Sequence, residues 1–183
     1  MIAIIGKSGV GKTTFLKKLE KHGFKVLIAD EFVNELYKKG NLGYKKIKHT
    51  LGEKYVDENG VNKKALKESI NLNLDFINEV EELIFPIIEN HLKITNYDFV
   101  EMSNIFSKNA NFLPYFSKII QISIPEENRV KNLKKRNVNN YDKNIIDALN
   151  KGFFTNDIVN ISSENVEEKI FFKMFFKIVF GLH

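Results

Sequence analysis

Short apolar runs alternate along the chain with longer segments in which apolar residues recur every three or four positions. The short runs are rich in β-branched residues and predict strands at Ile2–Ile5, Lys25–Ala29, Asp98–Glu101, Ile119–Ile124 and Ile158–Ile161. Apolar strands that alternate with helices are typical of a parallel sheet covered on both faces. The pattern therefore predicts an α/β fold of three layers around a five-stranded parallel sheet.

A long helical stretch separates the second and third predicted strands. Residues 31–96 have helical patterning around the turn Asp57-Glu58-Asn59-Gly60 and predict a helical insertion over the sheet. Within this stretch, apolar side chains at helical spacing predict a face that packs into the core: Leu72, Leu74, Phe76, Ile77, Val80, Leu83, Ile84, Ile87 and Ile88. The length of 183 residues predicts one domain, spanning residues 1–183.

Two later segments each allow two interpretations. Residues 135–145 are rich in Asn and basic side chains, which suits a short lid or an ordinary solvated loop. Residues 167–180 predict a helix with several Phe side chains beside a stripe of Lys169, Lys173 and Lys177. Such a helix suits a membrane surface or docking on the sheet, and we expect docking because a terminal helix of this fold needs an apolar face.

Composition limits the expected cellular location and the expected partners. Cysteine is absent and the first apolar run ends at Gly6-Lys7, too early for a signal peptide or a membrane span, so we expect a cytoplasmic protein without a membrane partner. The net charge of +5 suits a nucleic acid or a ligand with several phosphates. We expect no nucleic-acid partner, since no basic stripe is interleaved with aromatic residues. The four His residues lack metal-ligand spacing, and we expect a monomer without zinc.

The first strand leads into a glycine-rich segment that matches the Walker A pattern. The residues run Gly6-Lys7-Ser8-Gly9-Val10-Gly11-Lys12-Thr13, and a helical pattern follows. Glycines let backbone N–H groups approach phosphates, while Lys12 bridges the β- and γ-phosphates and the Thr13 hydroxyl binds Mg²⁺. ATP and Mg²⁺ are the expected ligands, and the residues expected to bind ATP are Gly6, Ser8, Gly9, Val10, Gly11, Lys12, Thr13 and Thr14.

Candidate residues for the reaction follow the strands. Asp30 comes just after the second predicted strand, where it suits either a general base for an acceptor hydroxyl or the N-cap of the next helix. Glu101 ends the third strand and suits Mg²⁺ binding through water or substrate positioning. Arg136 suits stabilisation of charge on the transferring phosphate. We therefore predict Lys12, Asp30 and Arg136 as catalytic residues.

In order along the chain, these motifs resemble those of the dephospho-CoA kinase family. Residues 26–30 resemble the end of the family's second strand, Asp-Ala-Asp, with Ile28 in place of the first Asp and Asp30 keeping the second. Residues 51–66 are similar to its Phe-Gly, Asp-Gly, Arg and Leu series, with Lys63 or Lys64 in place of the Arg. Residues 83–86 resemble its His-Pro element, with Phe85 replacing the His.

The resemblance continues into the second half of the chain. Residues 101–106 are similar to the family's Asp, Pro-Leu-Leu-Phe stretch, with Ser103 at a departure. Residues 125–136 resemble the helix that leads into its lid, where Arg136 matches one Arg and Asn132 replaces another. Residues 157–162 resemble the late strand whose end lies near the adenine of ATP.

The resemblance implies an enzyme that transfers a phosphoryl group from ATP to the ribose 3′-hydroxyl of dephospho-CoA, which is the small-molecule partner. It implies Asp30 as the base, and Asp30, Lys63 and Glu101 as substrate-binding residues. A nucleoside or nucleotide kinase of the same fold and a non-catalytic nucleotide-binding module remain alternatives. A regulatory GTPase is disfavoured because the Asn-Lys-x-Asp motif is missing.

Overall fold

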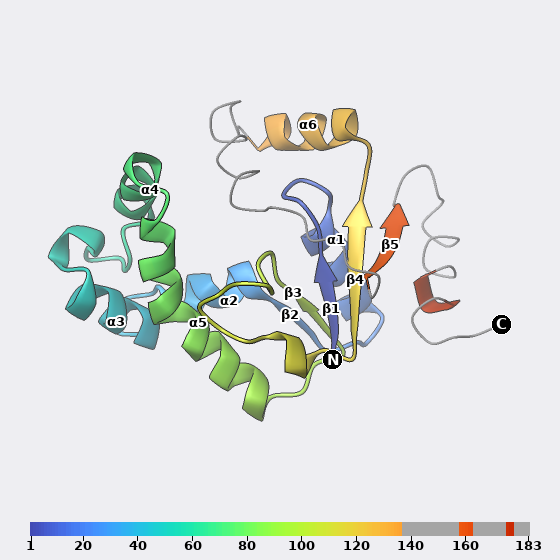
Figure 1. Cartoon of the computed structure of the whole chain (residues 1–183), viewed down its shortest axis with the longest axis horizontal. Helices are drawn as coiled ribbons and strands as arrows, with labels where there is room; N and C mark the ends of the chain where they lie inside the picture. The colour runs from blue at the N-terminus through green and yellow to red at the C-terminus, as the bar shows by residue number, and fades with distance from the viewer. Residues whose placement is uncertain (137–157, 163–174, 178–183) are drawn as a thin grey trace.

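The computed structural model describes residues 1–136, 158–162 and 175–177 (Figure 1). In these ranges helices alternate with strands, as the apolar pattern predicts. The elements are β1 (Ile2–Ile5), α1 (Lys12–Lys21), β2 (Val26–Ile28), α2 (Ala29–Leu36), α3 (Leu42–Thr50), η1 (Glu53–Tyr55), α4 (Lys63–Leu72), α5 (Phe76–Ile94), β3 (Phe99–Glu101), η2 (Leu113–Tyr115), β4 (Lys118–Ser123), α6 (Glu126–Lys135) and β5 (Ile158–Ser162). The predicted α/β class with a parallel sheet is confirmed.

The sheet has five strands in the order β2-β3-β1-β4-β5, and every neighbouring pair is parallel. Strand β1 is central, and its Ile2 pairs with both Phe99 and Lys118. Strand β2 is shorter than predicted because Ala29 is already the first residue of α2. In a parallel sheet with a central first strand, ligands bind outside the carboxyl ends of the strands.

The two faces of the sheet carry separate halves of the core. Successive residues of a strand point to opposite faces, so Ala3 and Ile5 pack in the cluster that contains α5, while Ile4 packs with α1. Residues 175–177 are the described part of the predicted last helix and are helical. Phe175 is fully buried, with its ring centroid 4.8 Å from that of Phe15 of α1. This contact agrees with the docking interpretation of the terminal helix.

Residues 31–96 contain the predicted helices, and α5 is the longest of those described there. Its buried side chains recur every fourth residue, at Val80, Ile84, Ile88 and Leu92. Asp57 accepts hydrogen bonds from the N–H groups of Asn59 and Gly60, which confirms the predicted turn.

The core face predicted around α5 is wrong at its first two positions. Leu72 and Leu74 are 90% and 46% exposed. Helix α4 ends at Leu72, and Asn73 is extended, so a turn separates α4 from α5 and takes both leucines off the buried face. None of the helices in the described ranges is long and apolar enough to cross a membrane.

Candidate functional site

A short loop connects the end of β1 to the start of α1, and we call Gly6–Gly11 the β1 loop. Three of its glycines have positive φ: 145° at Gly6, 89° at Gly9 and 96° at Gly11. A Cβ at Gly6 would collide with the carbonyl oxygen of Ile122 in β4. Gly11 is the left-handed N-cap of α1, and, as at the start of any α-helix, the backbone N–H groups of the first turn have no intrahelical partners. The β1 loop therefore needs glycine to turn this tightly against the sheet.

Lys12 opens α1 and folds its side chain back over the β1 loop. Its side chain is 7% exposed, and Nζ lies 2.8 Å from Gly6 O and 3.3 Å from Lys7 O. The same ammonium lies 3.5 Å from Glu101 Oε1, at the end of β3. The positive charge is thus held inside the curve of the loop, between backbone dipoles and one carboxylate.

Glu101 is a buried acid at the carboxyl end of β3. Its side chain is 2% exposed, and Oε2 has no hydrogen-bond partner within the described residues. Burial raises the pKa of Glu101, the positive charge of Lys12 opposes that rise, and the charges of Asp30 and Glu31 add to it. Two exposed acids of α2 therefore lie near enough to influence the buried acid beside Lys12.

Asp30 is the second residue of α2, and its side chain is exposed. The N-cap of α2 is Ile28, which makes no side-chain capping bond, so the interpretation of Asp30 as an N-cap is wrong. The cause is the early start of the helix at Ala29, which moves Asp30 into the first turn. A carboxylate at this position is free of a capping role and lies at the same sheet end as the β1 loop.

Lys63 begins α4 and reaches α2. Its Nζ donates a hydrogen bond to Asn34 Oδ1. Asn34 follows Asp30 by one helical turn, so the two side chains share a face of α2 with Cβ atoms about 5–6 Å apart. Of the predicted substrate residues, Lys63 therefore contacts the residue that follows Asp30 by one helical turn.

Arg136 is the exposed C-cap residue of α6 and the last residue described before residue 158. The described part of the chain contains no hydrogen bond from its guanidinium to the β1 loop. Residues 137–145, the greater part of the predicted lid, lie outside the described residues.

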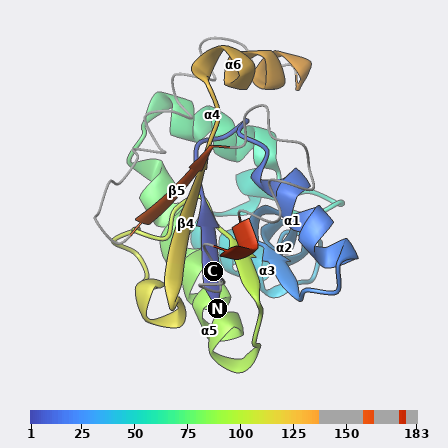
Figure 2. The ribbon, with the colours of Figure 1, turned by 90° about the vertical axis from the view of Figure 1, so that its right-hand side faces the viewer.

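Two side chains of α6 that the sequence did not single out as site residues contact the β1 loop. Helix α6 crosses the end of the sheet where β1 and β4 terminate (Figures 1 and 2). Arg129 Nη1 donates to Ser8 O at 3.1 Å, and Asn132 Nδ2 donates to Gly9 O at 2.9 Å. The sequence did contain an indication of this contact. Arg129 precedes the apolar Leu133 by four residues, so helical spacing places its charged group on the buried face of α6.

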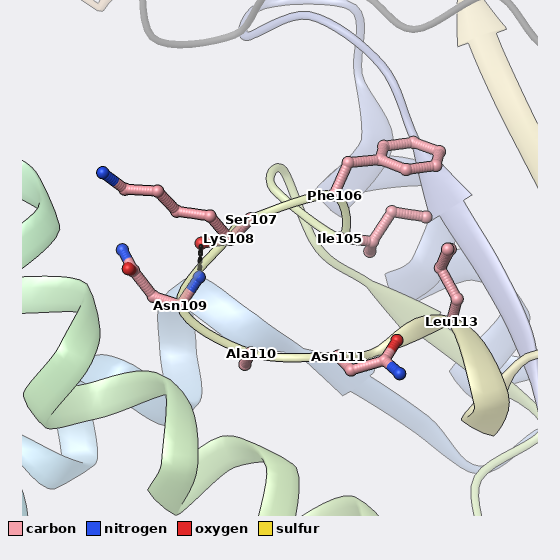
Figure 3. Close-up of a pocket in the computed structure, with 8 residues that line it drawn as sticks. All are labelled: Ile105, Phe106, Ser107, Lys108, Asn109, Ala110, Asn111 and Leu113. Carbon is pink, nitrogen blue, oxygen red and sulfur yellow. Dashed lines mark hydrogen bonds between the residues drawn. The ribbon is translucent and has the colours of Figure 1, made fainter.

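A second loop, residues 102–112, follows β3, and we call it the β3 loop. Glu81 of α5 accepts hydrogen bonds from Asn104 at 2.9 Å, Ser107 at 2.7 Å and Asn109 at 3.0 Å. Residues from this loop and the start of η2 line a pocket of about 570 Å³ (Figure 3): Ile105, Phe106, Ser107, Lys108, Asn109, Ala110, Asn111 and Leu113. The sequence did not predict that Glu81 anchors this loop.

Two positions that depart from the family motifs are part of the core. Ile28 is 6% exposed in β2. The ring of Phe85 lies edge-on to that of the buried Phe112, with centroids 5.3 Å apart. Apolar packing therefore accounts for both residues. Ser103 is exposed at the start of the β3 loop.

Across residues 1–136 and the two later described segments, no three His, Asp or Glu side chains gather into a metal site. Side-chain oxygen atoms at this end of the sheet come from Glu101, which contacts Lys12, from Asp30, whose charge acts on Glu101, and from the half-buried Thr13, which follows Lys12 in α1. A hard cation at this point would therefore take several ligands from a bound phosphate or from water.

Comparisons with known proteins identify the family of this chain. Residues 1–155 match the family model described as Dephospho-CoA kinase. A dephospho-CoA kinase of Mycoplasma pneumoniae is 31% identical over 129 residues, which cover 67% of this chain and 64% of the relative. One of Mycoplasma genitalium is 27% identical over 169 residues, which cover 87% of this chain and 85% of the relative. The first of these matches spans slightly less than two thirds of the relative's length.

Solved structures share the fold. TT1252 from Thermus thermophilus aligns with a TM-score of 0.67 and 17% identity, over 98% of this chain and 95% of the other. A dephospho-CoA kinase from Campylobacter jejuni aligns with a TM-score of 0.51 and 20% identity, over 98% and 97% of the two chains. Because the family model covers most of the sequence, the chain belongs to the dephospho-CoA kinase family.

Proposed function

We propose that this protein transfers the γ-phosphoryl group of ATP to the ribose 3′-hydroxyl of dephospho-CoA, the last step of coenzyme A synthesis. Family membership supports the reaction. The observation that carries it is the position of Asp30, two residues after Ile28, which pairs with Glu101 at the end of β3, while Glu101 Oε1 lies 3.5 Å from Lys12 Nζ. A free carboxylate beside a glycine-rich loop is what phosphoryl transfer to an alcohol requires.

The proposed architecture is a single P-loop kinase domain, residues 1–183. The helices of residues 31–96 bind the acceptor, and residues 135–145 form a short lid. The contact between Lys63 and Asn34 supports this role for the insertion, because it holds a cation against α2, one helical turn after Asp30. The acceptor carries phosphate groups that such a cation would attract.

The β1 loop and the start of α1 bind the phosphates of ATP. Glycines with positive φ and the free N–H groups at the start of α1 support this role. Lys12 exchanges its contacts with Gly6 O and Lys7 O for the β- and γ-phosphates. The residues assigned to ATP are Gly6, Ser8, Gly9, Val10, Gly11, Lys12, Thr13 and Thr14.

Mg²⁺ fits the oxygen atoms at this position. The buried Oε2 of Glu101 lacks a partner in the described ranges, and the Thr13 hydroxyl lies in the first turn of α1. Thr13 would bind the ion directly and Glu101 through water, which suits a hard cation that keeps part of its water shell. When bound, Mg²⁺ neutralises negative charge on the phosphates.

Asp30 accepts the proton of the acceptor hydroxyl and orients its oxygen toward the γ-phosphorus. The exposure of Asp30 supports this role, because an external substrate can reach it. Arg136, at the end of α6, offsets negative charge on the transferring group.

The direct test incubates purified protein with ATP, Mg²⁺ and dephospho-CoA and measures CoA by chromatography. Asp30→Asn should lower kcat by about a hundredfold or more while ATP affinity stays close to that of the wild type. Glu35→Gln, an exposed acid on the same helix, serves as the matched control and should retain activity. Absence of CoA at high enzyme concentration, with a nucleoside phosphorylated instead, would assign a different acceptor.

A further inference from the structure

Helix α6 donates two hydrogen bonds to carbonyl oxygens of the β1 loop. Arg129 Nη1 lies 3.1 Å from Ser8 O, and Asn132 Nδ2 lies 2.9 Å from Gly9 O. Donor and acceptor are 121 and 123 residues apart in the sequence. Two consecutive peptide groups of the loop are therefore held from outside by one helix.

The guanidinium of Arg129 is fixed in place. The residue is 1% exposed, and its Nε and Nη2 donate to the two carboxylate oxygens of Glu126 at 2.7 and 2.9 Å. A two-point pair of this kind sets the plane of the guanidinium, which directs Nη1 at Ser8 O. Leu133 adds packing, because a Cβ at Gly9 would lie 3.0 Å from its side chain.

Peptide geometry converts this hold on oxygen atoms into an orientation of N–H groups. In a planar trans peptide the C=O and N–H bonds point in opposite directions. Holding Ser8 O and Gly9 O toward α6 therefore turns the N–H groups of Gly9 and Val10 away from α6. The Val10 N–H faces Lys7 O inside the loop at 3.4 Å, and the Gly9 N–H has no acceptor among the described residues.

We propose that Arg129 and Asn132 are positioning residues that aim the Gly9 and Val10 amides at the phosphates of a bound nucleotide. This inference rests on the proposed role of the β1 loop as the nucleotide site. Without the two donors, the peptides rotate more freely, and binding must also order the loop. The lost affinity should come from contacts with the β- and γ-phosphates. The affinity for a nucleotide that lacks these phosphates should therefore fall less.

The test compares the affinities of ATP and AMP, measured by displacement of a fluorescent ATP analogue without any acceptor. Asn132→Leu removes one donor from a half-buried position and should raise the Kd of ATP about tenfold, against about twofold for AMP. Arg129→Leu should raise the Kd of ATP by about thirtyfold, and Arg129→Lys, which keeps a donor, by less. Lys134→Gln, on an exposed position of α6, should match the wild type.

A purely structural role would lower the melting temperature without changing the ratio of the two affinities. Equal losses for ATP and AMP, or wild-type ATP affinity in Asn132→Leu, would overturn the proposal. If Arg129→Leu fails to fold, the Asn132 variant still decides the question. A wild-type protein that binds ATP but forms no CoA would contradict the proposed function and leave this test intact, whereas one that binds no ATP would overturn both.

Discussion

The β1 loop and the β3 loop follow neighbouring parallel strands, yet they are held in different ways. The β1 loop is short and rich in glycine, and its carbonyl oxygens are bonded by Lys12, Arg129 and Asn132. The β3 loop contains no glycine, and its side chains converge on the carboxylate of Glu81. In the β1 loop the carbonyl groups are bonded, so backbone N–H groups stay available for an anion. In the β3 loop the side chains are bonded to Glu81, and the loop residues line a pocket. The difference separates a loop with N–H groups available to a ligand from a loop whose residues line a pocket of about 570 Å³.

The largest effect should come from filling the space at Gly6. Gly6→Ala places a methyl group against Ile122 O at a positive φ, and we expect a cost of about 3 kcal/mol in folding and a hundredfold or greater loss of ATP affinity. The checks are urea unfolding and ATP titration. Gly23→Ala is the matched control, because Gly23 also has positive φ but faces open space. Equal effects at the two positions would show that crowding against β4 is irrelevant.

The anchor of the β3 loop should matter for the acceptor and not for ATP. Glu81→Ala removes the acceptor of three hydrogen bonds, and we expect the KM for dephospho-CoA to rise about tenfold, equivalent to about 1.4 kcal/mol. The Kd of ATP should stay within about twofold of the wild type. Glu82→Ala, the exposed neighbour, should change neither constant. A larger change in ATP affinity than in acceptor KM would contradict a role of the β3 loop in acceptor binding.

Glu101 lies between the loops and should make stability depend on pH. Burial raises its pKa in the folded protein, so its contribution to stability is complete below the ordinary value of 4.5 and is lost as the pH rises through the folded pKa. Relative to the wild type, Glu101→Gln should therefore gain stability with rising pH across this window, by about 1.4 kcal/mol for each unit of the pKa difference. Urea unfolding between pH 4.5 and 7 gives the comparison, with exposed Glu58→Gln as control. Parallel curves for the wild type and the Gln variant would contradict the raised pKa.

The smallest expected effect concerns His91, which lies on α5 like Glu81. Among the described residues, its side chain makes no hydrogen bond to the β1 loop or the β3 loop. Its Nε2 lies 2.7 Å from the Tyr97 hydroxyl, and its pKa is lowered by burial and by the charge of Lys25. Stability from the neutral ring is present above pH 6.5 and is lost as the pH falls through the lowered pKa. His91→Gln should therefore lose less stability than the wild type between pH 8 and 5, without a change in KM. Melting curves at both pH values, with exposed His49→Gln alongside, provide the check.

Local sequence patterns predicted the fold and the β1 loop well. The β-branched run at residues 119–124 and the Gly-Lys-Thr order at residues 11–13 each specify their conformation over a few neighbouring residues. Asp30, Lys63 and Glu101 were also chosen from local position or motif order. The closeness of Asp30 and Glu101 follows from the parallel topology, which brings the carboxyl ends of β2 and β3 to one edge, whereas Lys63 meets α2 through the packing of α4.

The contacts that hold the two loops could not be predicted, because they join distant segments. Arg129 meets Ser8 only after α6 has docked, and Glu81 meets the β3 loop only after α5 has packed on the sheet. The exposure of Leu72 and Leu74 was missed for a related reason. A helical repeat continues through these residues in the sequence, while the extended backbone at Asn73 ends one helix and starts another.

The central position of β1 has a consequence for synthesis on the ribosome. Ile2 precedes its partners Phe99 and Lys118 by about a hundred residues in the chain. At about 5–20 residues per second, the first strand waits roughly 5–20 s with both edges unpaired. During that interval the helices between β2 and β3 are synthesised. Assembly of the nascent sheet therefore begins only once β3 arrives, and Lys12 and the β1 loop gain their contacts with Glu101 and α6 only after that.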